Sequence, residues 1–264
     1  MLVSACNQER SMQKRTIAVS IEPLRYFTEQ IAGDKFNVVS IAGANDNPEN
    51  FIPNGENLSL VSKSDIFIKV GAIGYENRWQ QLIENKAPHT IIADSSEGIE
   101  LLMTPSGKPD PHTWMSCTNA AIIARNIYLA LAAIDHRDST YFRHNLDNLM
   151  TDIEQTDSEI REMLTKDKAK TFMLYHPSLT YFANDYGLVQ IALEQMGREP
   201  DQTMLQVLVD SAKHAGARVF YIEKQYSKIA KGKSKDIKGM TTAEFNPMSY
   251  KWRDEMVNIA KALR

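Results

Sequence analysis

The stretch from Thr171 to Leu188, TFMLYHPSLTYFANDYGL, limits the possible folds of this chain more than any other segment. Its first five residues are mostly apolar and follow two lysines, a pattern typical of a short strand buried on both faces of a parallel sheet. Pro177 ends this strand directly after His176. We therefore expect the His176 imidazole at the carboxyl end of a central strand, the edge at which open α/β sheets bind ligands.

A second histidine has a similar setting. His112 follows a proline in the segment 110–114, Asp-Pro-His-Thr-Trp, just before a helix that we expect to begin near Thr118. One buried histidine is usually explained by ordinary hydrogen bonding. Two such histidines, in loops far apart in the sequence, instead favour a shared ligand site.

Strand and helix patterns alternate along the chain, which is typical of an α/β fold. We expect strands at 16–21, 37–41, 66–70, 90–93, 171–175, 189–193, 218–222 and 241–245. The segment 231–238 is expected to be a basic, solvated loop. A helix over about 140–165, about 40 Å long, carries a stripe at helical spacing that consists of Tyr141, Leu146, Leu149, Ile153, Ile160 and Leu164.

Two motifs, taken in order, resemble a known family. Asp-Pro-His-x-Trp, followed much later by His-x5-Phe-x3-Tyr-Gly-Leu, is similar to the metal-binding solute receptors of bacterial ABC transporters, which deliver zinc, manganese or iron. The segments 20–24, 31–34 and 71–79 agree with the family in the same order. The resemblance covers residues 15–264.

This resemblance implies the periplasmic metal-binding-protein architecture. Its fold is α/β, with two Rossmann-like lobes whose sheets are mainly parallel and which are joined by one long rigid helix. We expect an N-terminal lipoprotein-like tether over 1–14, an N-terminal lobe over 15–138, the linking helix over 139–166 and a C-terminal lobe over 167–264.

The resemblance also implies a metal site made of Glu49, His112, His176 and Asn246. Relatives usually supply the first ligand from a proline-histidine pair, and Glu49 stands in the place of that histidine. A carboxylate can also bind zinc, manganese or iron, so the change makes the site richer in oxygen and more anionic.

The fourth ligand stays open at this point. Relatives usually have an aspartate where this chain has Asn246, and an amide oxygen is a weak ligand for zinc. Asn246 would bind weakly or be replaced by water, by Glu244 or by Glu223, which ends a strand at the ligand edge. Glu223 is otherwise expected to support the ligands from behind.

The implied function is an extracytoplasmic solute-binding protein that captures a divalent metal ion as cargo between two lobes and passes it to an ABC permease. Zinc is favoured, with manganese or iron as the alternative, and the protein is expected to be a monomer and not an enzyme. Affinity should fall below about pH 6, because ligands must lose their protons to bind a metal.

Two other functions use the same residues. A metal-dependent hydrolase would keep an open position for an activated water, but the chain lacks an H-E-x-x-H helix, a G-x-S-x-G elbow and a carboxylate pair at catalytic spacing. An adhesin-like surface protein is the second alternative. One bound ion per chain, without hydrolysis of generic esters or phosphates, would favour the receptor.

Charge and cysteine content exclude other classes. The net charge of -3, with acidic and basic residues interspersed, gives no basic patch for nucleic acid. Cys6 and Cys117 are too few for a disulfide framework. Val3-Ser4-Ala5-Cys6 resembles the end of a lipoprotein signal, so lipid on Cys6 would anchor the protein on the periplasmic or outer face of the cytoplasmic membrane. The most apolar segment, 120–134, is expected to be an amphipathic or buried helix and not a membrane span.

Overall fold

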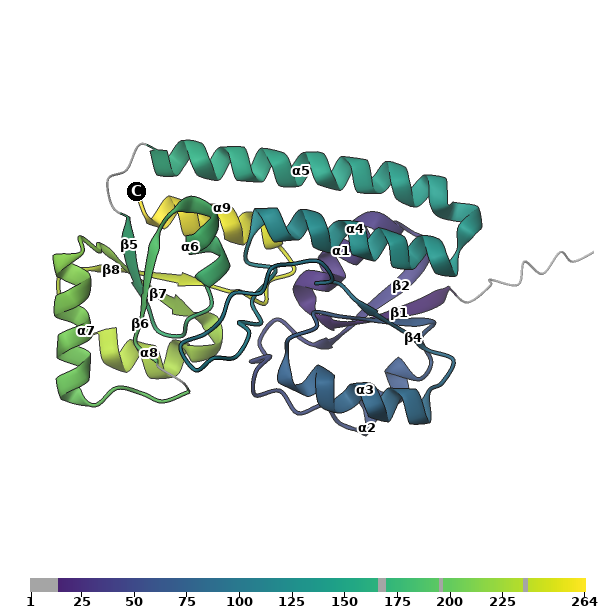
Figure 1. The fold of residues 1–264 in the computed structure, drawn as a ribbon, viewed down its shortest axis with the longest axis horizontal. Helices are drawn as coiled ribbons and strands as arrows, with labels where there is room; N and C mark the ends of the chain where they lie inside the picture. The colour runs from purple at the N-terminus through teal and green to yellow at the C-terminus, as the bar shows by residue number, and fades with distance from the viewer. Residues whose placement is uncertain (1–13, 166–169, 195–196, 235–236) are drawn as a thin grey trace, which may run out of the picture.

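Two parallel four-stranded sheets lie next to each other along the longest axis of the molecule (Figure 1). The computed structural model describes residues 14–165, 170–194, 197–234 and 237–264. The expected α/β architecture with two lobes and one long helix is confirmed. Cys6 and the rest of the expected tether up to residue 13 lie outside the described residues.

The first sheet has the strand order β2-β1-β3-β4, and all of its pairings are parallel. Its central strand β1 is buried over most of its length because helices cover both faces of the sheet. The elements of this lobe are β1 (Arg15–Ile21), α1 (Glu22–Ala32), β2 (Phe36–Ala42), α2 (Gly55–Val61), β3 (Ile66–Lys69), α3 (Gly74–Lys86), β4 (Ile91–Asp94) and α4 (Cys117–Ile134).

The second sheet repeats this pattern with the order β6-β5-β7-β8, again entirely parallel. All four residues of β5 are buried, as the apolar run predicts, and the strand ends two residues before His176. The elements here are β5 (Thr171–Leu174), α6 (Thr180–Tyr186), β6 (Val189–Ala192), α7 (Gln202–His214), β7 (Val219–Glu223), α8 (Ser227–Ser234), β8 (Thr241–Phe245) and α9 (Trp252–Ala262), with short 3-10 turns at His136–Asp138 and Lys224–Tyr226.

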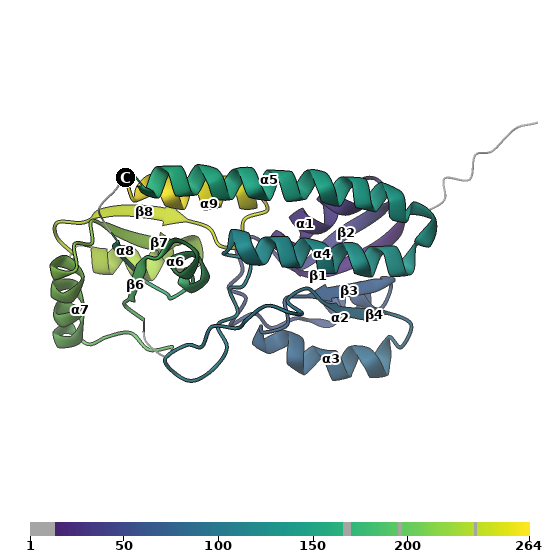
Figure 2. The same cartoon turned by 45° about the horizontal axis from the view of Figure 1, so that its top comes forward.

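Helix α5 (Ser139–Thr165) runs along one side of both sheets (Figures 1 and 2). It packs on α1 and α4 of the first lobe and on α9 of the second. The expected apolar stripe is correct except at its first residue. Tyr141 is 37% exposed, whereas Phe142 is fully buried, because Phe142 lies four and seven positions before Leu146 and Leu149 and so shares their face.

One further local expectation was wrong, and one helix was not predicted. Residues 231–234, expected in a loop, belong to the last turn of α8, which buries Ala230. Helix α2 forms because the Asn54 side chain accepts hydrogen bonds from the backbone N–H groups of Glu56 and Asn57. Pro23 lies in the first turn of α1, where no N–H donor is needed.

Helix α4 is, among the described residues, the one helix long and apolar enough by composition to cross a membrane. Its packing assigns it to the protein core instead. One face, which includes Ile123, Ile127 and Leu131, is buried, and α4 contacts α1 and α5 extensively. The opposite face carries the exposed Arg125. This agrees with the expected amphipathic or buried helix.

Two tryptophans hold the lobes together beside the ligand edge. The Trp114 side-chain N–H donates to the carbonyl of Pro247 over 2.7 Å, and the Trp252 side-chain N–H donates to the carbonyl of Trp114 over 2.7 Å. Both indole rings are almost completely buried. Each N–H therefore has a partner in the opposite lobe, which ties the loop that carries His112 to the end of β8.

Candidate metal centre

Three of the expected ligand side chains meet at the carboxyl edges of the two sheets. Glu49 lies in the loop after β2, His112 lies in the loop before α4, and His176 follows β5. One side-chain ligand atom from each lies within 4.8 Å of the others. The expected convergence of two imidazoles from opposite lobes is therefore present, with ring centroids 5.4 Å apart.

The spacing of these atoms suits a small cation. His176 Nε2 lies 3.3 Å from Glu49 Oε2. Two donors that each bind a zinc ion at about 2.0 to 2.1 Å in tetrahedral geometry lie about 3.3 Å apart. The two side chains can thus bind one ion without a large movement.

The His112 ring is held by a buried carboxylate. Asp110 Oδ1 lies 2.8 Å from His112 Nδ1 and also accepts a hydrogen bond of 2.9 Å from the His112 backbone N–H. Both side chains are nearly inaccessible to solvent. Burial acts to raise the pKa of Asp110, but the nearby His112 outweighs it, and the net pKa lies below the ordinary value. Asp110 is therefore ionised and leaves His112 Nε2 to face the site.

His176 has an equivalent arrangement. Its Nδ1 lies 3.0 Å from Glu194 Oε2, and its ring stacks on Tyr226 with centroids 4.9 Å apart. A carboxylate behind a metal-binding histidine orients the ring and raises its basicity. Burial acts to lower the pKa of His176, but hydrogen bonding to Glu194 and the charges of Glu49 and Glu223 outweigh it, so the net pKa is raised.

Glu223 holds the backbone next to His176 and is not part of the ligand group. It accepts hydrogen bonds from the Ser178 hydroxyl at 2.8 Å and from the His176 backbone N–H at 3.4 Å. Burial raises its pKa to about 7. These contacts agree with the expected supporting role, because they fix the backbone on both sides of Pro177.

Asn246 and Glu244, the two candidates for the fourth ligand, have different surroundings. Glu244 lies on the exposed face of β8 and is outside the ligand group formed by the described residues. Asn246 uses both ends of its amide for hydrogen bonds. Its nitrogen donates to Ala44 over 3.1 Å, and its oxygen accepts from Gln225 over 2.7 Å and from the Met248 backbone N–H over 3.0 Å.

Both histidines line a small hollow between the lobes. Its volume is ≈ 10 Å³, roughly what one water-sized sphere needs. Its walls consist of Asn47, Pro48, His112, His176, Glu223, Gln225, Tyr226 and Pro247. This hollow is large enough for an ion or a water molecule.

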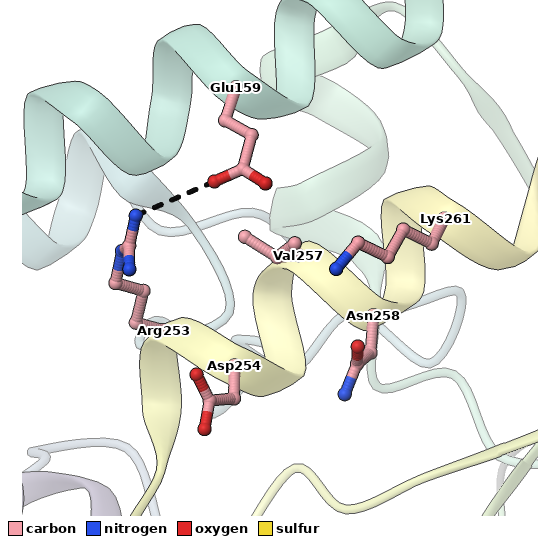
Figure 3. Close-up of a pocket in the computed structure, with 6 residues that line it drawn as sticks. All are labelled: Glu159, Arg253, Asp254, Val257, Asn258 and Lys261. Atoms are coloured by element: carbon pink, nitrogen blue, oxygen red, sulfur yellow. Dashed lines mark hydrogen bonds and ion pairs between the residues drawn. The ribbon is translucent and has the colours of Figure 1, made fainter.

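A larger hollow lies elsewhere, between α5 and α9 (Figure 3). Arg253 of α9 and Glu159 of α5 face each other there at 3.5 Å, and the remaining wall is formed by Asp254, Val257, Asn258 and Lys261. None of these residues belongs to the ligand group. Exposed ion pairs of this kind contribute little to stability, and the hollow contains no histidine or cysteine.

Cys117 takes no part in the site. It is the first residue of α4 and is 2% exposed. Burial raises the pKa of its thiol to about 12. The thiol therefore stays protonated at neutral pH, and a protonated thiol is a poor metal ligand.

Asp110 and Glu194 are the supporting residues that the sequence reasoning did not identify. Asp110 could have been found, because it lies two residues before His112 in the same motif. Glu194 could have been suspected from its position just after β6, at the same sheet edge as His176. Nothing in the sequence indicates which histidine a given carboxylate contacts.

We expect Asp110→Asn to weaken zinc affinity by about 10- to 100-fold, the usual effect of removing a carboxylate behind a histidine ligand. The amide has the same shape and can still accept from the His112 backbone, so the fold should be retained. Isothermal titration with zinc would measure the change. Asp185→Asn is the matched control, because Asp185 bonds to Ser116 outside the site. Equal affinities for the two variants would contradict the role of Asp110.

Comparison with known proteins gives a consistent family. The family model described as zinc-uptake complex component A, periplasmic, matches residues 17–260. A zinc-binding lipoprotein, AdcA, from Streptococcus pneumoniae R6 is 26% identical over 270 residues, which cover 94% of this chain and 52% of the relative. The chain thus spans about half the length of that relative. ZnuA of Bacillus subtilis 168 is 24% identical over 256 residues, covering 87% of this chain and 80% of the relative.

The solved structures agree with the sequence relatives. A crystal structure of ZnuA superposes with a TM-score of 0.88 at 29% identity and covers 94% of this chain and 97% of the other. A manganese-bound periplasmic metal-binding protein from Candidatus Liberibacter asiaticus, at 18% identity and a TM-score of 0.83 over 95% of this chain and 100% of the other, shares the fold. The family model spans both lobes and all three expected ligand residues, and the chain therefore belongs to the family of periplasmic zinc-uptake complex component A.

Proposed function

We propose that this protein is the extracytoplasmic solute-binding component of an ABC importer and captures one divalent transition metal ion, zinc by preference, between its two lobes. The observation that carries the proposal is the meeting of His112 and His176, from opposite lobes, with the carboxylate of Glu49. Two neutral imidazoles and one carboxylate are donors that first-row divalent ions bind well.

The chain also lacks the sequence features of common hydrolases with related chemistry. It has no H-E-x-x-H helix and no G-x-S-x-G elbow. The family description names an uptake component and not an enzyme. The ion is therefore cargo.

Manganese is the second candidate ion, because Glu49 adds a hard oxygen donor where a third imidazole would favour zinc. The names of the relatives include both zinc and manganese. The manganese ABC transporter substrate-binding lipoprotein PsaA of Streptococcus mitis is 26% identical over 227 residues, covering 81% of this chain and 73% of the relative.

The partner and the location follow from the same proposal. The protein would work as a monomer, with a permease in the cytoplasmic membrane, at the periplasmic or outer face of that membrane. Lipid on Cys6 would hold it there. An adhesin-like role would be secondary, and mass spectrometry of the membrane-bound protein would test the lipid.

Elemental analysis of the protein as isolated tests the proposal most directly. One zinc ion per chain, removed by a chelator and restored by titration to a one-to-one ratio, is the expected result. Anomalous scattering at the zinc edge should place the ion between the two histidine rings. Protein that is free of metal after isolation and shows no saturable one-to-one binding would contradict the proposal.

We expect zinc affinity to decrease as the pH falls, and the decrease should begin above pH 6.5, the ordinary histidine value. The pKa of His176 is raised, so its imidazole stays protonated to a higher pH and competes with the metal there. Each displaced proton should weaken binding by about tenfold per pH unit below that pKa. Titrations between about pH 5 and pH 8 would measure this slope. Constant affinity down to about pH 5.5 would contradict it.

A further inference from the structure

The ligand group leaves the coordination of the ion incomplete. Glu49, His112 and His176 supply three donor atoms, whereas zinc takes four or more ligands in proteins and manganese takes more. This inference rests on the proposed function. It concerns which group provides the next donor.

Asn246 does not provide it. Its side-chain oxygen already accepts two hydrogen bonds, from Gln225 Nε2 and from the Met248 backbone N–H, and a carbonyl oxygen has two lone pairs. Its nitrogen donates to the carbonyl of Ala44 in the first lobe. Asn246 is therefore a connection between the lobes.

Gln225 lines the hollow between the lobes, and its side-chain oxygen has no hydrogen-bond partner. Its nitrogen donates to the carbonyl of Ala44 over 3.1 Å and to Asn246 Oδ1 over 2.7 Å. Both partners are acceptors, so they fix which end of the amide is nitrogen. The oxygen, Oε1, is one of two buried side-chain nitrogen or oxygen atoms in the described part of the chain that lack a hydrogen-bond partner.

A buried acceptor without a partner is unfavourable, so native proteins usually give such an atom a bound ion or water. Gln225 lines the same space as His112 and His176. We propose that Gln225 Oε1 is the fourth donor to the bound ion. The ion then has two imidazole nitrogens, one carboxylate oxygen and one neutral carbonyl oxygen, while Asn246 and Ala44 hold the amide in position.

This donor predicts a specific effect on metal preference. Carbonyl oxygen is a hard ligand that suits manganese better than zinc. Gln225→Met keeps a side chain of similar length but replaces the amide by a soft thioether. We expect it to weaken Mn²⁺ binding by about 10- to 100-fold and Zn²⁺ binding by a smaller factor, so the ratio of the two Kd values rises.

Tyr226→Phe is the matched control. It removes the 2.7 Å hydrogen bond between Asn47 and the Tyr226 hydroxyl, another connection between the lobes, but keeps the ring that stacks on His176. We expect this variant to change both affinities by the same factor. Competitive titrations of the metal-free full chain with Mn²⁺ and Zn²⁺ would measure both ratios.

The outcomes are distinguishable. Equal losses for the two metals in Gln225→Met would show that Gln225 only connects the lobes, and unchanged affinities, or an unaltered protein that does not bind Mn²⁺, would also overturn the assignment. If the unaltered protein binds neither ion at a one-to-one ratio, the proposed function itself fails. A Kd ratio that rises in Gln225→Met and stays constant in Tyr226→Phe supports the donor.

Discussion

His176→Ala is expected to raise the Kd for zinc by more than about 100-fold, which exceeds the usual effect of losing an outer supporting group. The substitution removes one of the three side chains expected to bind the ion. It also removes the ring nitrogen that lies 3.0 Å from Glu194 Oε2. Isothermal titration with the metal-free protein would measure the loss, and elemental analysis should find little zinc after isolation.

His144→Ala is the control for this experiment. His144 is exposed on α5 and is outside the ligand group, so its loss should leave zinc affinity unchanged. His112→Ala should behave like His176→Ala, since each lobe contributes one ring. Zinc affinity close to that of the unaltered protein in both ligand variants would refute the shared site.

Trp114→Ala should have the largest effect on stability, about 3 to 5 kcal/mol of unfolding free energy. The ring is fully buried, and its loss leaves a cavity and an unpaired carbonyl at Pro247. For a chain of this length we expect the unfolding midpoint to fall by about 10 °C. Thermal unfolding of the metal-free protein, followed by circular dichroism, would measure it.

The same variant should also weaken zinc binding, because the Trp114 ring lies 5.3 Å from the His112 ring and joins its loop to the second lobe. Trp79→Ala separates the two effects. Trp79 is also buried, but it lies on α3 within one lobe, so its loss should lower stability without changing zinc affinity. A similar effect of both variants on affinity would contradict the interlobe role of Trp114.

Much of the fold could be predicted because local patterns follow from backbone geometry. The apolar run at 171–175 can be buried in only a few ways, and the long stripe of α5 repeats at the helical period. The main failures were local too. Helix α2, which begins after the Asn54 cap, was not predicted, and Tyr141 was expected on the buried face that Phe142 occupies.

The residues of the site also differ in how far local patterns predicted them. His112 and His176 were predictable, because each follows a strand or precedes a helix at the ligand edge of a parallel sheet. Glu49 and Asn246 came from the family pattern. The structure places Glu49 beside both rings and engages Asn246 in hydrogen bonds between the lobes.

The sequence by itself determined the strands, the long helix and the positions of the two histidines, because these depend on residue spacing within single segments. Only the tertiary structure decided that Asp110 and Glu194 orient the rings, that two tryptophans join the lobes, and that Gln225 Oε1 is buried without a partner. The tryptophan contacts connect residues up to 138 positions apart, so spacing within one segment carries no information about them. The contact between Asp110 and His112 is local, but only the folded loop shows that this carboxylate turns toward the ring.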